Sequence, residues 1–259
     1  MNKAVRLLKP LMPILSAAYG LAVIYLTALP VAGGQPSFFG EVMTWLITLA
    51  GIALTFFLVH RVEPKVFPSA GLFPLKLPKI SVMVGLLLIA PLWKVAEGYI
   101  LYGISSLTYT IQMKPLTYTT EELREDLLSS VHAVLLAPIL EELCFRQMAI
   151  SPFHRRSTQI VVCVVMAILF GILHVRNFPG AFISAIFYGA VLIWSRNIWY
   201  SVTLHAGSNL AATLLAVYCW LGLGEMQMTR IPVIILPDIK VIIVSLLLAI
   251  AGVLLLKKR

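Results

Sequence analysis

Two adjacent carboxylates and a guanidinium lie inside an apolar stretch of the chain, as Glu141, Glu142 and Arg146 within residues 127–150. An ionised side chain near the centre of a bilayer costs at least ~2.5–3.5 kcal/mol, so three of them together indicate a function. Glu142 and Arg146 are four residues apart and can pair along one face of a helix. Glu141 points about 100° away from that pair, so we expect its partner on another segment.

Two further polar clusters interrupt later apolar stretches. His174 follows Phe170 by one helical turn, and Asn209 follows His205 by one turn. Residues at this spacing share a helix face, so His205 and Asn209 should project into the same space. Together with Glu141, these groups lie on three separate segments. Burying them without a function would cost packing stability, which favours a functional site.

Other polar residues in the apolar stretches have simpler interpretations. Lys94 and Glu97 are three residues apart and can neutralise each other near a helix end, where the lysine can reach the interface. A single intramembrane histidine, His132, can bond to a carbonyl of a neighbouring helix. We therefore predict structural roles for these three residues.

The residue types at the three clusters suit peptide hydrolysis. The carboxylate of Glu141 can take a proton from water, and His174 can orient that water or share its proton. His205 and Asn209 can donate hydrogen bonds to the developing oxyanion. Two histidines and a glutamate are also a zinc set, with water as the fourth ligand. The sequence lacks the compact His-Glu-x-x-His helix, so a metal-free mechanism is favoured and zinc stays the alternative.

The composition indicates a polytopic helical membrane protein. Hydrophobic residues make up 60% of the chain and charged residues 12%, and apolar runs of about 20 residues recur. The net charge of +9 lies mostly between these runs, so we interpret it as a topology signal and expect no nucleic-acid partner. An all-α fold with about eight transmembrane helices is predicted. The expected spans are residues 11–32, 39–60, 80–104, 127–150, 159–174, 181–194, 199–221 and 241–256.

The charges of the connecting segments alternate along the chain. Basic residues such as Lys76, Arg155 and Arg196 fall on one side, and the acidic segment 121–126 falls on the other. The positive-inside rule then places both termini in the cytoplasm. The longest connection, residues 105–126, is expected to be an interfacial helix or loop. We expect residues 1–259 to form one transmembrane domain.

Helix rise raises a question about depth. At 1.5 Å per residue, His174 would lie about 22 Å from Gln159, whereas Glu141 would lie about 14 Å from Ile150. Two arrangements reconcile these values. Either the fifth helix begins well outside the membrane surface, or it is steeply tilted.

The order of the three clusters resembles the CPBP family of CAAX-processing and bacteriocin-processing intramembrane proteases. The resemblance rests on Glu-Glu-x-x-x-Arg, Phe-x-x-x-His and His-x-x-x-Asn on successive helices and covers about residues 127–214. It implies a membrane-embedded active site of Glu141, His174, His205 and Asn209. Glu142, Arg146 and Phe170 would support it. Many members have glycine directly after the motif arginine, where this chain has Gln147.

The function that follows is an intramembrane endopeptidase acting on a membrane-associated protein or peptide. A prenylated CAAX tail, a leader peptide or a C-terminal sorting helix would each suit the family. Two rivals remain open. The buried residues could form an ion or proton relay in a transporter or channel, or the chain could be a non-catalytic immunity or scaffold protein. No inverted repeats or paired broken helices favour the transporter.

Overall fold

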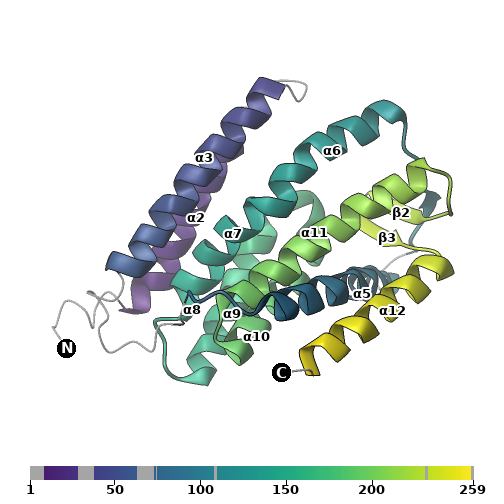
Figure 1. Ribbon diagram of the computed structural model, residues 1–259. Coiled ribbons are helices and arrows are strands. Elements are labelled where there is room, and N and C mark those ends of the chain that lie inside the picture. The colour runs from purple at the N-terminus through teal and green to yellow at the C-terminus, as the bar shows by residue number, and fades with distance from the viewer. Residues whose placement is uncertain are drawn as a thin grey trace.

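The computed structural model describes residues 9–28, 38–62, 73, 75–107, 110–230 and 233–257. Helices form most of this structure (Figure 1). The long helices are α2 (Met12–Ala28), α3 (Phe38–Phe57), α5 (Ile80–Ser106), α6 (Thr120–Leu135), α9 (Arg156–Leu173), α10 (Phe178–Ser195), α11 (Ile198–Trp220) and α12 (Ile239–Lys257). The short ones are η1 (Lys9–Leu11), η3 (Leu58–Val62), α7 (Ala137–Glu142), η4 (Leu143–Gln147), α8 (Met148–Ile150) and η5 (Val175–Asn177).

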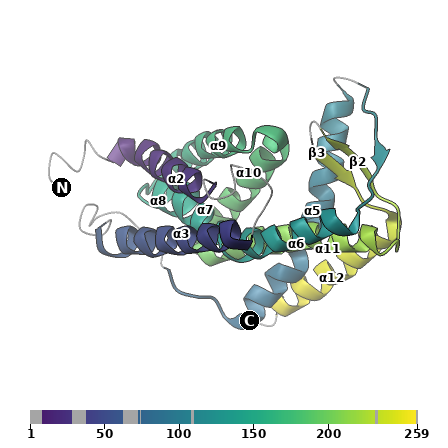
Figure 2. The same ribbon diagram turned by 90° about the horizontal axis from the view of Figure 1, so that it is seen from above.

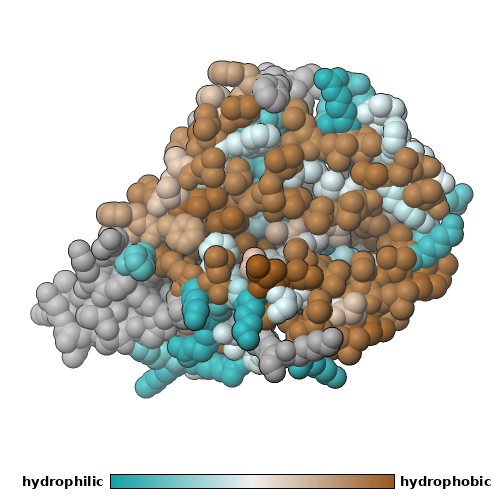
Figure 3. Space-filling view, in the orientation of Figure 1, coloured by the Kyte–Doolittle hydropathy of each residue, from teal (hydrophilic) through white to brown (hydrophobic). Residues whose placement is uncertain are grey.

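The chain is an all-α, multi-pass integral membrane protein. Within the described residues, seven helical segments are long and apolar enough to cross a membrane, and α6 to α8 count as one of them. The first expected span, residues 11–32, corresponds to α2, whose 17 described residues are fewer than the roughly 20 that span a bilayer. Figure 3 shows hydrophobic side chains over most of this face, with hydrophilic ones gathered at its upper right and lower edges.

The connection between α5 and α6 differs from the expected interfacial helix or loop. α5 continues to Ser106, and α6 begins at Thr120, where Thr119 and Glu122 form a reciprocal capping box. Between them lies a short strand, β1 (Lys114–Pro115). It pairs antiparallel with β2 (Gln227–Arg230), which pairs with β3 (Val233–Leu236). The sequence analysis missed this small sheet because two- and four-residue strands are too short to show a clear alternation.

The connections cluster at two ends of the bundle, in line with the alternation expected from the sequence. At one end, the Asn197 side chain donates to the carbonyl of Lys76, and the Trp199 indole donates to that of Leu75. At the other end, the Trp220 indole donates to the Thr120 hydroxyl, and β1 pairs with β2. The cytoplasmic placement of both termini stays a prediction.

The segment that carries the two glutamates is broken. Leu136 interrupts the chain between α6 and α7, and Pro138 occupies the first turn of α7, where a missing N–H costs no helix hydrogen bond. The π-helical turn η4 follows directly after Glu142. Such wide turns are common at functional sites because they redirect side chains. The sequence pattern gave only a continuous span here.

The elements around this broken segment pack closely. α9 and α10 lie side by side as a hairpin, joined by η5 (Figure 2). α11 runs beside α6 and also contacts α5. A Cβ at Gly207 would lie 2.6 Å from the Cβ of Ala90, so glycine lets α11 approach α5 at this point. These contacts bring α5, α6, α9, α10 and α11 around one space.

Candidate active site

Glu142 and Arg146 form the buried ion pair that the sequence predicts. Oε1 of Glu142 lies 3.3 Å from Nη1 of Arg146, and both side chains are almost fully inaccessible. The Arg146 guanidinium also lies 4.4 Å from the ring centroid of Phe170, a distance suited to a cation–π interaction. The pair therefore connects the segment 137–150 to α9.

Glu142 has a second partner that the sequence analysis missed. Nδ1 of His205 lies 2.9 Å from the same Oε1 atom of Glu142. A carboxylate at this distance accepts the proton of Nδ1 and so holds the ring in one orientation. Glu142 thus makes an ion pair with Arg146 on its own segment and accepts a hydrogen bond from His205 on α11.

Glu141 faces the other nitrogen of the same imidazole. Its Oε2 lies 3.7 Å from Nε2 of His205, which is longer than a direct hydrogen bond. The His205 ring therefore lies between two adjacent glutamates, because one residue of helix rotates their side chains by about 100°. Ring contacts fix its plane: Tyr188 stacks on it at 4.8 Å, and Phe170 meets it edge-on at 6.3 Å.

His174 lies directly after α9, in the turn that leads to η5. Its Nδ1 is 2.8 Å from the carbonyl oxygen of Phe170, and its ring lies 4.4 Å from the Phe170 ring. A carbonyl can only accept, so Nδ1 carries the proton and Nε2 is the acceptor nitrogen of the neutral ring. The aromatic ring one turn earlier thus supports the imidazole, as the spacing predicts.

Asn209 also has a structural contact. Its amide nitrogen donates to the carbonyl of Ala133 at 2.7 Å and so ties α11 to α6 near the break before α7. The amide group has a second N–H, which this bond leaves available.

The four residues expected to be catalytic line one cavity of about 320 Å³. Neither Glu142 nor Arg146 lines it, so the two adjacent glutamates are separated as the sequence predicts. The remaining lining residues come from α5, α6, α7, α9, η5, α10 and α11. They are Lys94, Glu97, His132, Ala133, Ala137, Phe170, Asn177, Gly180, Ala181, Ser184, Tyr188 and Ser208.

The site residues meet although they lie at different helical distances from the ends of their segments. The α9–α10 hairpin turns at the cavity, so the C-terminal end of α9 delivers His174 to the place where α7 and α11 deliver Glu141 and His205. α9 begins at Arg156, three residues before the expected start.

Two interpretations of single polar residues need correction. Lys94 and Glu97 form the expected pair, with Nζ 3.0 Å from Oε2, but they lie well inside the 27-residue helix α5 and line the cavity, where we expected a helix end. Nε2 of His132 lies 2.9 Å from the hydroxyl of Thr48 on α3, where we expected a backbone carbonyl. Sequence spacing shows that Lys94 and Glu97 can pair but not which space they border.

Gln147 occupies the position where many family members have glycine. Its side chain is fully buried, and its amide nitrogen donates to the carbonyl of Phe73 at 2.8 Å. It does not line the cavity, so this departure changes how the segment before α5 is held and leaves the candidate site residues as they are.

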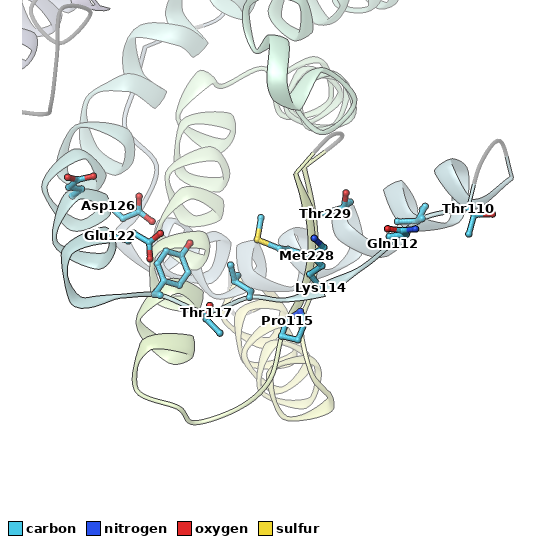
Figure 4. Close-up of a pocket in the computed structure, with 13 residues that line it drawn as sticks. Thr110, Gln112, Lys114, Pro115, Thr117, Glu122, Asp126, Met228 and Thr229 are labelled. Carbon is cyan, nitrogen blue, oxygen red and sulfur yellow. The ribbon is translucent and has the colours of Figure 1, made fainter.

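A larger cavity, of about 930 Å³, lies apart from the predicted site residues. Figure 4 shows it between β1, the neighbouring strand and the start of α6, with Lys114, Glu122, Asp126 and Thr229 along its walls. Burial raises the pKa of Tyr118, at its edge, to about 12, and the nearby Asp126 carboxylate adds to this effect. No residue of the three polar clusters lines this cavity, so we place the candidate site in the smaller one.

The donor set at the candidate site bears on the zinc alternative. Across the part of the chain that the structure describes, no three His, Cys, Asp or Glu side chains are grouped closely enough to hold a metal ion together. The Nδ1 atoms of both candidate histidines are engaged by protein oxygens, so Nε2 is the nitrogen that each ring has left for a water or a metal ion.

The fold and cavity together define a multi-pass membrane protein with a polar site inside its helix bundle. Residues 124–211 match the family model described as type II CAAX prenyl endopeptidase Rce1-like. This range contains all three polar clusters, and it confirms the resemblance to the CPBP and CAAX protease family. Over these residues the chain is therefore similar to a family of intramembrane peptidases. No curated protein and no solved structure gives a significant match.

Proposed function

We propose that this protein is an intramembrane endopeptidase that hydrolyses a peptide bond of a membrane-associated protein or peptide through a glutamate-activated water. The observation that carries the proposal is the convergence of Glu141, His174, His205 and Asn209 on one cavity. The family description favours a prenylated C-terminal tail as substrate. A leader peptide and a sorting helix are the alternatives that the test includes.

Water activation falls to Glu141 and His174. Glu141 borders the cavity and has no protein donor within hydrogen-bonding distance among the described residues, so its carboxylate is available to accept a proton. In His174, Nδ1 carries the proton and donates a hydrogen bond to the carbonyl of Phe170. Nε2 of the same ring is therefore a hydrogen-bond acceptor. Together they can hold one water by two of its hydrogens and direct its oxygen at the substrate carbonyl.

Stabilisation of the oxyanion falls to Asn209 and His205. Asn209 keeps one N–H beyond the one it donates to Ala133. His205 donates from Nε2 only when that nitrogen carries a proton in addition to the one held by Glu142. The proposal therefore requires an imidazolium between Glu142 and Glu141 during the reaction. Two donors aimed at the developing charge are the usual means of stabilising a tetrahedral intermediate.

The proton balance closes within these groups. The water oxygen bonds to the carbonyl carbon, and one water proton passes to Glu141. When the C–N bond breaks, Glu141 returns that proton to the leaving amine. The second water proton stays on the new carboxylic acid, which releases it to solvent when it ionises. Glu142 and Arg146 transfer no proton in this reaction. Their role is to hold His205 and the segment after α7 in place.

The test is hydrolysis by purified protein in liposomes. Three peptide probes should be offered: a farnesylated peptide ending in cysteine and three further residues, a leader peptide and a C-terminal sorting helix. Products are read by mass spectrometry. We expect cleavage of at least one probe, and Glu141→Gln should lower kcat/KM about 10²–10⁴-fold. The matched control is Glu121→Gln, an exposed carboxylate on α6 outside the cavity. Full activity of Glu141→Gln, or no cleavage by the wild type, contradicts the proposal.

A further inference from the structure

The candidate active-site cavity contains a cation that the proposed reaction does not use. Lys94 of α5 lines the cavity, and its Nζ lies 3.0 Å from Oε2 of Glu97. The same carboxylate oxygen accepts a hydrogen bond from Ser184 on α10 at 3.1 Å. Glu97 is nearly inaccessible, whereas a quarter of the Lys94 side chain is exposed. Glu97 is thus a buried anchor, and Lys94 is the member of the pair that faces open space.

Lys94 has donors to spare. An ammonium group has three N–H donors, and among the described residues Glu97 is its one hydrogen-bond partner. Two donors are therefore left for another acceptor. A charge-assisted hydrogen bond to a carboxylate is about twice as strong as a neutral one, so an anionic group of the substrate is the ligand that this position fits best.

Asn177 stands beside the pair. Its Oδ1 is buried and has no hydrogen-bond partner within the described structure. A Cβ built on Gly180 would lie 2.6 Å from Oδ1 of Asn177 and 2.7 Å from Oε1 of Glu97. The Asn177 amide and the Glu97 carboxylate therefore both lie next to Gly180. The NH₂ group of the same amide is the donor that Asn177 can offer to an incoming acceptor. Lys94 and Asn177 then offer donors from two different elements, α5 and η5.

A small apolar cavity adjoins these polar groups. It measures about 40 Å³ and shares Lys94, Glu97 and Asn177 with the candidate active-site cavity. Its other walls are mostly apolar: Leu101 from α5, Leu215 from α11 and Ile235 from β3 are examples. The four candidate catalytic residues, the Lys94 cation and the apolar recess therefore form a continuous series in this order.

From this series we infer that Lys94, together with Asn177, binds the free C-terminal carboxylate of the substrate, and that the apolar recess takes its terminal aliphatic side chain. The inference rests on the proposed function. An anion inside a helix bundle needs a countercharge to offset its desolvation, and Lys94 supplies it while Glu97 keeps the lysine in place. The protein would then select the cleavage position by its distance from the chain end.

The experiment compares two forms of one probe, a farnesylated peptide ending in cysteine and three further residues. One form has a free C-terminal carboxylate and the other a carboxamide. We expect the wild type in liposomes to hydrolyse the acid with a kcat/KM about 10–100-fold above that of the amide, as a charged hydrogen bond would give. In the double variant Lys94→Met/Glu97→Gln, which leaves no unpaired charge, the ratio should fall to about one.

Two further variants complete the test. Lys94→Arg retains the cation and should retain a preference for the acid. Lys240→Met removes an exposed lysine that donates to the carbonyl of Leu223 and lines neither cavity, so its acid-to-amide ratio should equal that of the wild type. Equal hydrolysis of acid and amide by the wild type, or an unchanged ratio in the double variant, overturns this inference and leaves the peptidase standing. Failure of the wild type to cleave either form also overturns this inference, and failure on the leader peptide and the sorting helix as well overturns the proposed function itself.

Discussion

Neutralising each of the two adjacent glutamates should separate stability from activity. Glu142 is fully buried, and its Oε1 serves both Arg146 at 3.3 Å and His205 at 2.9 Å. Glu142→Gln leaves the guanidinium buried without its countercharge. Removing one partner of a buried pair costs about 3–5 kcal/mol, so we expect this variant to unfold much more readily than the wild type.

Glu141→Gln should behave in the opposite way. Among the described residues, the one ion-pair contact of Glu141 is with His205 at 3.7 Å, beyond hydrogen-bonding distance. Glu141→Gln should therefore cost less than about 1 kcal/mol in stability. Hydrolysis by this variant should fall about 10²–10⁴-fold because the proton acceptor is lost. The same substitution at two adjacent positions should therefore give a folding defect at Glu142 and a catalytic defect at Glu141.

The measurement is thermal and denaturant unfolding in detergent, run beside hydrolysis of the cleaved probe at matched amounts of folded protein. A double variant, Glu142→Gln/Arg146→Met, removes both charges and should recover much of the lost stability. Equal stability of Glu142→Gln and wild type would refute the reasoning about the buried pair. A destabilisation of Glu141→Gln as large as that of Glu142→Gln would refute the separation of roles.

Four further outcomes are expected. Asn209→Ala should lower kcat about 10²–10³-fold through loss of an oxyanion donor, and the lost bond to Ala133 should cost about 1 kcal/mol of stability; unchanged kcat would remove Asn209 from the mechanism. Chelator should leave hydrolysis unchanged, whereas loss restored by zinc would favour the metal mechanism. Reporter tags at the two termini should both face the cytoplasm, and opposite faces would overturn the topology. Burial raises the pKa of Asp238, but hydrogen bonds from Tyr218 and the N–H of Val241 outweigh it and hold the pKa below its usual value. Its contribution is therefore present above pH ~4 and is lost as pH falls through the lowered pKa; hydrogen exchange at the start of α12 should rise there in the wild type and not in Asp238→Asn.

The sequence alone determined the class of protein and much of the candidate site. Long apolar runs can bury their backbone polar groups in a bilayer only as helices, so composition and run length predicted the all-α membrane fold. The i, i+4 spacing predicted the Glu142–Arg146 pair and the placement of Phe170 beside His174. These are local relations, and helix geometry fixes them without knowledge of the rest of the fold.

The tertiary structure decided what lies between helices. It placed His205 between Glu141 and Glu142, and it brought Lys94 to the wall of the same cavity. Lys94 and Glu97 pair at the same spacing whether they face lipid, a helix end or a substrate, so their pattern could not reveal their surroundings. The sheet and the turn of the α9–α10 hairpin were also hidden, because contacts between residues far apart in sequence depend on helix packing and leave no period along the chain.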